Sequence, residues 1–197
     1  TIYYGSQYLH RSKDRGGNWE IISPDLTTND PEKQKQSESG GLTYDVTGAE
    51  NFTTIIAIAP SPVQQGAIWV GTDDGNVHFT EDGGASWTDM TTRFTGVPKG
   101  SWVPQIVAST YDAGEAFVVM NNYRRNDWVP YLYRTTNSGR SWRKIVDEDQ
   151  VWGHVLSFVQ DPMEPNLMFI GTEFGLYVSI DGAKNWTKWT HGFPTVS

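Results

Sequence analysis

Four acidic residues of this chain stand where turns between strands are expected, and pairs of such carboxyl groups can cleave glycosidic bonds. They are Asp73, Asp74, Asp127 and Glu173. Hydrolysis of a glycosidic bond needs two carboxyl groups that face one cleft, about 5–9.5 Å apart. Each of the four lies in or beside a link between the second and third strands of a predicted sheet, so they could converge at one end of the fold. Turn formation is the competing explanation, because Asp73-Asp74-Gly75 is a common hairpin signal.

Six aromatic or basic side chains are the predicted binding residues: Tyr123, Arg124, Arg125, Trp128, Trp102 and Trp152. The first four lie in one segment, residues 121–130, and are of the types that supply much of the energy at protein interfaces. Their rings could also stack on a sugar or cap a sheet. The other two tryptophans come just before predicted innermost strands, where they could line the mouth of a central channel or pack inside the sheet.

The composition excludes several classes of function. The net charge of −8 argues against nucleic acid or an anionic membrane surface as a partner. Without cysteine the chain has no disulfide, no cysteine-bound zinc and no thiol nucleophile. The four histidines show no paired spacing for a metal, so we expect neither a metal nor a cofactor. No apolar run reaches the roughly 18 residues of a membrane span.

The elements that would position these residues are marked by an octapeptide that occurs four times. Its characteristic residues are Ser12, Asp14, Gly16 and Trp19; Thr80, Asp82, Gly84 and Trp87; Thr135, Asn137, Gly139 and Trp142; and Ser179, Asp181 and Trp186, with Ala183 in place of the glycine. The carboxylate or amide can accept from backbone N–H groups of its own turn, and glycine allows a positive φ. The tryptophan should be buried between sheets. We therefore expect structural turns, with the copy that contains Ala183 departing from the shared conformation.

This octapeptide resembles the Asp-box, and the chain resembles Asp-box (BNR-repeat) β-propellers. Trp69–Gly75 and Phe169–Gly175 strengthen the resemblance, since both run into a strand and then an octapeptide. The chain is similar to the large sortilin-type propellers of secreted bacterial proteins, which are often named glycosyl hydrolases. The resemblance implies an all-β fold, a β-propeller of four-stranded antiparallel blades. Relatives by repeat type include sialidases, xyloglucanases and a factor that assists photosystem II assembly, so the fold leaves the function open.

The predicted blades cover residues 1–22, 53–90, 102–146 and 154–189 of a single propeller region, residues 1–197. The first blade lacks its innermost strand, so we expect about four blades. Either the end of the chain supplies the missing strand or, as we favour, the blades form part of a larger ring. Residues 23–52 form a long insertion. The octapeptides and the turns between first and second strands should share one end of the blades. The long segments 23–52, 91–103, 121–130 and 147–153, which we expect to be irregular, should share the other end, where we expect function.

Three functions are compatible with these features. The one we favour is a non-catalytic interaction propeller that binds protein or glycan partners through the end opposite the octapeptides. The second is an accessory or assembly subunit on the periplasmic face of a membrane complex, without insertion into the membrane. The third is a glycoside hydrolase that acts on a polysaccharide. We expect a bacterial protein that is exported to the periplasm or the cell exterior.

Overall fold

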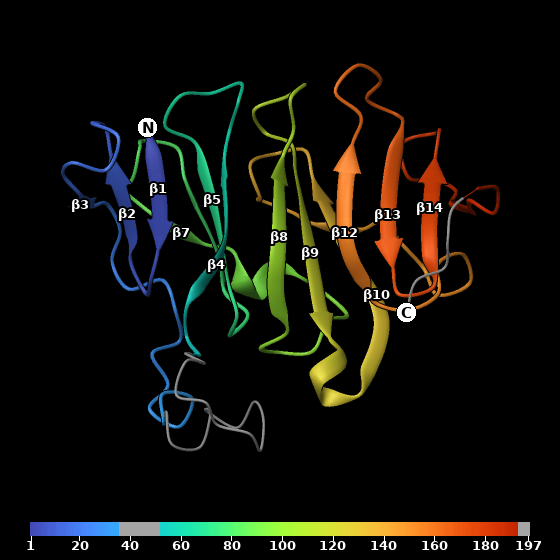
Figure 1. Ribbon diagram of the computed structural model, residues 1–197, viewed down its shortest axis with the longest axis horizontal. Helices are drawn as coiled ribbons and strands as arrows, with labels where there is room; N and C mark the ends of the chain where they lie inside the picture. The colour runs from blue at the N-terminus through green and yellow to red at the C-terminus, as the bar shows by residue number, and fades with distance from the viewer. Residues whose placement is uncertain (36–51, 193–197) are drawn as a thin grey trace.

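The computed structural model describes residues 1–35 and 52–192 of the chain, and the regular secondary structure of this part is almost entirely β-strand (Figure 1). Its strands form one three-stranded and three four-stranded sheets, all antiparallel in their pairing. Two short 3-10 helices, η2 (Thr91–Arg93) and η3 (Tyr123–Arg125), lie between strands. No helix in these two ranges has the length and apolar character that crossing a membrane requires. The predicted all-β class is therefore confirmed.

Each sheet follows the chain, so neighbouring strands in sequence are neighbours in space. The first sheet consists of β1 (Ile2–Gly5), β2 (Leu9–Ser12) and β3 (Glu20–Ile21). The second consists of β4 (Ile55–Pro60), β5 (Ile68–Thr72), β6 (Val77–Thr80) and β7 (Thr88–Asp89). The third consists of β8 (Trp102–Ala108), β9 (Ala116–Asn122), β10 (Asp127–Thr135) and β11 (Arg143–Lys144). The fourth consists of β12 (Val155–Gln160), β13 (Met168–Thr172), β14 (Gly175–Ser179) and β15 (Thr187–Lys188).

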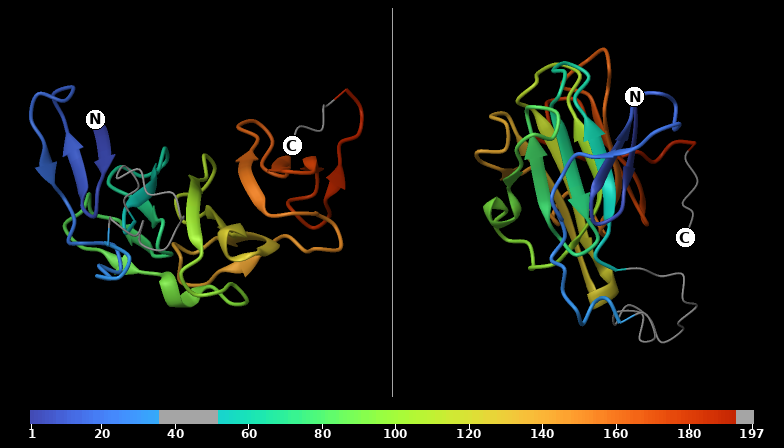
Figure 2. Two further views of the ribbon diagram at one scale, coloured as in Figure 1. Left: turned by 60° about the horizontal axis from the view of Figure 1, so that its bottom comes forward. Right: turned by 90° about the vertical axis from the view of Figure 1, so that its left-hand side faces the viewer.

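The four sheets stand side by side around an open arc, in the manner of propeller blades (Figure 2). Side chains of one strand alternate between the two faces of its sheet, and in the second and third blades both faces pack against a neighbouring blade. In β5, Ile68 and Val70 belong to the apolar cluster shared with the first sheet. Trp69, between them, belongs to the cluster shared with the third sheet. One apolar core therefore lies in each gap between blades.

The octapeptide forms the same turn in all four copies. In the second, the Thr80 hydroxyl donates to Asp82 over 2.8 Å, and the backbone N–H groups of Gly84 and Ser86 donate to Thr80 and Asp82 over 3.0 and 2.9 Å. Hydrogen bonds from the Ser86 side chain and backbone keep the pKa of the exposed Asp82 well below its usual range. The prediction that the copy with Ala183 departs from this turn is wrong. Ala183 adopts a φ of 66° and its N–H still reaches Ser179 over 2.9 Å.

The octapeptide tryptophans link successive blades. The indole N–H of Trp87 donates to the carbonyl of Ile22 over 2.9 Å, and that of Trp186 donates to the carbonyl of Ile145 over 2.8 Å. In both cases the acceptor directly follows the outermost strand of the preceding blade. Trp19 is 47% exposed, and none of the described sheets lies against it as a preceding blade. The expectation that each of these tryptophans is buried between sheets is therefore wrong for Trp19.

The two ends of the blades differ as predicted. The backbone N–H groups of Gly83, Ser138 and Gly182, all in octapeptides, donate over 2.9–3.0 Å to the turns that join first and second strands. At the opposite end, in the lower part of Figure 1, lie the described part of the insertion and the hairpin that contains η3. Residues 121–130 were expected to be irregular, and this is wrong. Strands β9 and β10 extend through most of that segment, and η3 with the left-handed Asn126 closes the hairpin.

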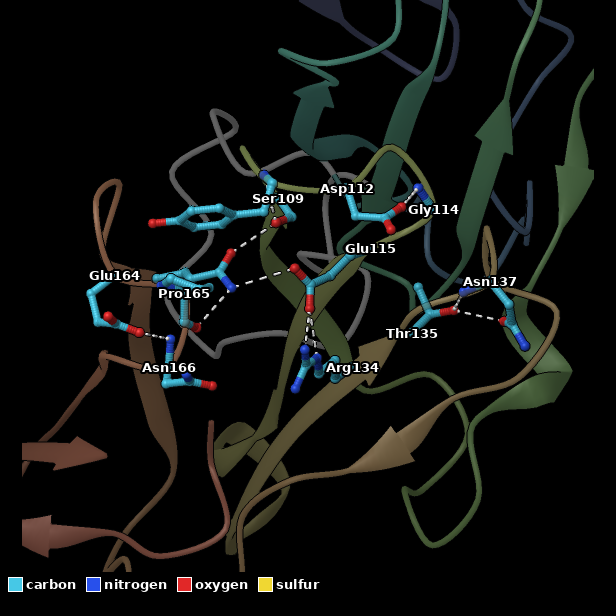
Figure 3. Close-up of polar contacts among 12 residues, drawn as sticks. Ser109, Asp112, Gly114, Glu115, Arg134, Thr135, Asn137, Glu164, Pro165 and Asn166 are labelled. Atoms are coloured by element: carbon cyan, nitrogen blue, oxygen red, sulfur yellow. Dashed lines mark hydrogen bonds and ion pairs between the residues drawn. The ribbon is translucent and has the colours of Figure 1, made fainter. Parts of the chain in front are cut away.

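A polar network at the octapeptide end holds the third and fourth blades together (Figure 3). The guanidinium of Arg134 donates to the buried Glu115 carboxylate over 2.7 Å, and the Gln160 amide donates to the other oxygen of that carboxylate over 3.4 Å. The Ser109 hydroxyl completes the network by donating to Gln160 over 2.9 Å. Glu115 and Arg134 both belong to the third blade, so the hydrogen bonds of Gln160, on β12, are the ones that join the two blades.

Candidate functional site

A cleft of about 880 Å³ opens between the third and fourth blades, at the end opposite the octapeptides. Its walls come from three segments: the start of β10, the loop between β11 and β12, and the turn between β13 and β14. The lining residues are Asn126, Asp127, Trp128, Val129, Pro130, Glu148, Val151, Trp152, Gly153, Glu173 and Phe174. A pocket of this size with aromatic walls and a few polar groups is the usual form of a small-ligand site.

Three aromatic rings of the cleft are exposed to solvent. Trp128, Trp152 and Phe174 are 46%, 67% and 43% exposed. Exposed aromatic surface gathered in one place is common at binding sites, which makes this cleft the candidate site. Gly153 makes room for this arrangement, because a Cβ atom at that position would lie 2.7 Å from the Phe174 ring. Trp128 and Trp152, both predicted as binding residues, thus lie on one cleft together with Phe174.

Three carboxylates lie among these rings. Asp127 accepts hydrogen bonds from the Tyr131 hydroxyl over 3.0 Å, from the Asn122 amide over 3.2 Å and from the Val129 N–H over 3.2 Å. An oxygen of Glu173 lies 3.7 Å from Nδ1 of His154. Glu148 is the third acidic residue of the lining. Asp127 and Glu173, two of the four acidic candidates, are therefore brought to the same cleft.

A buried histidine supports the rings behind this cleft. His154 is 4% exposed, and its ring stacks on Tyr123 with centroids 4.7 Å apart and lies 5.5 Å from the ring of Trp128. Burial lowers the pKa of His154, and the nearby Glu173 opposes this only in part. The imidazole is then uncharged at neutral pH and packs as a flat, largely apolar ring. Tyr123, a predicted binding residue, belongs to this supporting layer.

The remaining binding candidates form a second cluster beside the cleft. Trp102 is buried and stacks on Phe52 with centroids 5.5 Å apart and planes 7° apart. The guanidinium carbons of Arg124 and Arg125 each lie 5.1 Å from the centroid of the Trp102 ring. Trp102 is the first residue of β8, the innermost strand of its blade. Its ring packs against both guanidinium groups.

Asp73 and Asp74 lie outside the cleft and act as structural acceptors. Asp73 is buried and accepts from the N–H of Thr54 over 2.8 Å. Burial is the main cause that raises its pKa to about 6. Asp74 is 1% exposed and accepts from the N–H and the hydroxyl of Thr28 over 2.7 and 2.6 Å. These bonds attach the start of the 23–52 insertion to the second blade; residues 36–51 of that insertion lie outside the described part.

Sequence reasoning missed several residues that the structure brings to this end: Glu148, His154, Phe174, Phe52 and Lys33. For one of them, Phe174, the sequence repeat contains a signal that could have identified it. Aligning Gly71-Thr-Asp-Asp-Gly75 with Gly171-Thr-Glu-Phe-Gly175 puts Phe174 where the other repeat has Asp74. An exposed ring in place of a turn residue is a departure from the repeat that points to binding.

Comparison with known proteins places the fold. No family model matches the chain. An oligoxyloglucan-reducing end-specific xyloglucanase from Emericella nidulans is 25% identical over 144 residues, which cover 69% of this chain and 17% of the relative. A solved ancestral GH74 enzyme gives a TM-score of 0.64 at 17% identity, over 95% of this chain and 22% of its own. The GH74 xyloglucanase from Xanthomonas campestris gives 0.63 at 14% identity, over 98% and 29%.

A different kind of protein shares the same architecture. YCF48 bound to a D1 peptide gives a TM-score of 0.51 at 18% identity, over 71% of this chain and 42% of its own. At these identities the likeness shows the fold, which is that of a partial β-propeller, and does not show the function. The chain spans 17% of the length of the xyloglucanase and 22% of that of the ancestral GH74 enzyme.

Proposed function

We propose that this region is a non-catalytic interaction propeller that binds glycan chains in the cleft between its third and fourth blades. The observation that carries the proposal is the grouping of Trp128, Trp152 and Phe174, all exposed, on one cleft with three carboxylates. Flat apolar rings offer surfaces on which the C–H faces of a sugar can lie. Carboxylate oxygens accept hydrogen bonds from sugar hydroxyls. A cleft with both suits a carbohydrate, which presents apolar C–H faces and hydroxyl groups to its site.

The state of Asp127 supports binding rather than catalysis. Its carboxylate already accepts three hydrogen bonds, and a carboxylate has about four acceptor positions in all. Little of it remains to take up or deliver a proton at a substrate. We infer that Asp127 shapes the β10 wall of the cleft and that Glu173 and Glu148 contact the ligand.

The wider setting belongs to the same proposal. We infer that the repeated turns are Asp-boxes of the sortilin-like type, that residues 1–197 form one propeller region, and that the protein is exported by a bacterium to the periplasm or cell exterior. Polymeric glycans are found there, and the xyloglucanase relative acts on an oligosaccharide by its name. We propose that neither nucleic acid nor membrane insertion is involved.

Binding of neutral oligosaccharides by calorimetry tests the proposal. Trp152→Ala and Phe174→Ala should each weaken binding about tenfold, because each removes an exposed ring of the type that dominates binding energy. Their melting temperatures should stay near that of the parent protein, since both rings are largely outside the core. Trp19→Ala is the matched control, because Trp19 is also about half exposed and lies on the first blade. Unchanged affinity in both cleft variants would contradict a glycan site here.

Glycoside hydrolysis is the second candidate, because Asp127 and Glu173 line the same cleft. It predicts that the full-length protein releases sugars from a polysaccharide panel and that Glu173→Gln or Asp127→Asn abolishes the release. Binding without any release would leave the non-catalytic proposal standing.

The third candidate is an accessory subunit that holds a protein partner, as YCF48 holds a peptide by its description. It predicts that the protein purifies with a membrane complex in fixed proportion. In that case the double variant that carries Arg124→Ala and Trp128→Ala should no longer purify with the partner, while each single variant remains folded.

A further inference from the structure

Three cations that lie over aromatic rings at the loop end make no ion pair within the described residues, although the chain as a whole carries a net charge of −8. They are Lys33, Arg124 and Arg125. Within residues 1–35 and 52–192, the ion pairs are made by other basic residues, and no carboxylate lies within 4.0 Å of these three. The charge of Lys33 acts at longer range on the buried Asp73, where it opposes in part the rise in pKa. A group of unpaired cations on an acidic protein creates a local positive potential and favours an anionic ligand.

Aromatic rings hold these cations in place. The Arg124 guanidinium carbon lies 5.1 Å from the centroid of Trp102 and 4.7 Å from that of Tyr123. The ammonium of Lys33 lies 5.0 Å from the centroid of Phe52, which in turn stacks on Trp102. Contacts of this kind attract a cation to the face of a ring without using its N–H donors. Arg124 and Lys33 are thus held in place by rings, while their hydrogen-bond donors stay available.

The two arginines have different roles. One terminal nitrogen of Arg125 donates to the carbonyls of Lys99 and Gly100 over 3.2 and 3.1 Å, and so ties η3 to the loop before β8. Arg124 makes no hydrogen bond and no ion pair in the described chain, and it is exposed. The five N–H donors of the planar Arg124 guanidinium are therefore free to bind a ligand in the plane of the group, while the faces of the group lie against the rings of Trp102 and Tyr123. That geometry matches a carboxylate, which a guanidinium binds through two parallel hydrogen bonds.

The arginine and the cleft are joined by a continuous set of rings. Tyr123, in contact with Arg124, lies 6.2 Å from Trp128 by ring centroids, and Trp128 lines the cleft. We propose that Arg124 binds a carboxylate of the same glycan that occupies the cleft, so that the ligand is an acidic polysaccharide built with uronic acids. This inference rests on the proposed glycan function. The exposed ring of Trp128 favours a sugar chain over an acidic peptide, because it offers a stacking surface at the cleft next to the Tyr123 ring that Arg124 contacts.

A pair of oligosaccharides that differ only in charge tests the inference. The probes are an oligogalacturonate and the same oligosaccharide after reduction of its carboxyl groups to alcohols, with binding measured by calorimetry at low salt. The parent protein should bind the acidic probe about tenfold more tightly than the reduced one, because a charge-assisted bidentate contact is lost on reduction. Arg124→Gln should abolish this preference and leave the affinity for the reduced probe within about twofold. Arg140→Gln, the same change at the octapeptide end, should keep the preference.

Each other result has a definite meaning. Equal binding of the two probes by the parent protein, or a preference that survives Arg124→Gln, would overturn the inference and leave the glycan site intact. Binding of a poly-glutamate peptide with no binding of the acidic oligosaccharide would also overturn it, in favour of a protein partner. Failure of both oligosaccharides and of the neutral panel would overturn the proposed function itself.

Discussion

The second and fourth blades carry the same turn between their second and third strands, yet the two turns have opposite roles. In the second blade, Asp73 and Asp74 are 6% and 1% exposed and accept hydrogen bonds from Thr54 and Thr28. In the fourth, Phe174 is 43% exposed and lines the cleft together with Glu173. The insertion covers the first turn, and no described segment covers the second. A repeated turn therefore becomes structural or available for binding according to what lies over it.

The largest difference between the two turns should appear on truncation at their equivalent positions. Asp74→Ala leaves two donors of Thr28 without an acceptor and leaves the hydroxyl of Thr72 with only its long contact of 3.5 Å to the Asn76 carbonyl. We expect the free energy of unfolding to fall by about 3–5 kcal/mol, since loss of one partner in a buried polar network leaves the others unpaired. Phe174→Ala should cost about 1 kcal/mol or less. Urea denaturation of both variants measures the contrast, and similar losses would refute it.

The second contrast concerns pH. Burial raises the pKa of Asp73 to about 6. Between about pH 4 and 6 the unfolded chain has released this proton while the folded chain still holds it, so stability falls as pH rises through that window. Asp73→Asn has no proton to lose and its side-chain oxygen can still accept from Thr54. At pH 7 it should be more stable than the parent by about 2–3 kcal/mol.

The control for this prediction is Glu173→Gln, the same change at the equivalent position of the fourth blade. The Glu173 side chain is 33% exposed, so the free energy of unfolding should follow the parent's pH dependence closely. Denaturation curves between pH 4 and pH 7 give the comparison. A parent-like fall in stability in Asp73→Asn would show that another group is responsible.

The smallest effect should come from the segment that covers the first turn. Thr28→Val removes the hydroxyl that donates to Asp74 over 2.6 Å and keeps the backbone N–H that donates over 2.7 Å. We expect a loss of about 1 kcal/mol, the net value of one hydrogen bond. Hydrogen exchange should show faster opening of residues 23–35 with little change in the fourth blade. Uniform loss of protection across all blades would mean that the insertion is part of the global core.

Much of the scaffold followed from the sequence because its signals are local. The octapeptide makes its hydrogen bonds within eight residues, so its turn could be predicted from residue types alone, even though Ala183 was wrongly expected to disrupt it. Strand alternation and the turn residues between strands likewise predicted the sheets to within a few residues. The clearest error in the strands, at residues 121–130, arose because hairpin extension depends on a partner strand rather than on the polarity of the segment.

The sequence by itself determined the blades, their order and which end carries the varied loops, because these depend on short-range periodicity and turn chemistry. It also supplied Asp127, Trp128, Trp152 and Glu173 as candidates, without showing that they meet. Only the tertiary structure decided that these four share one cleft while Asp73 and Asp74 are buried under the insertion. The physical reason is that exposure and proximity at this end are set by contacts between segments far apart in the chain, such as Thr28 with Asp74 and Phe52 with Trp102.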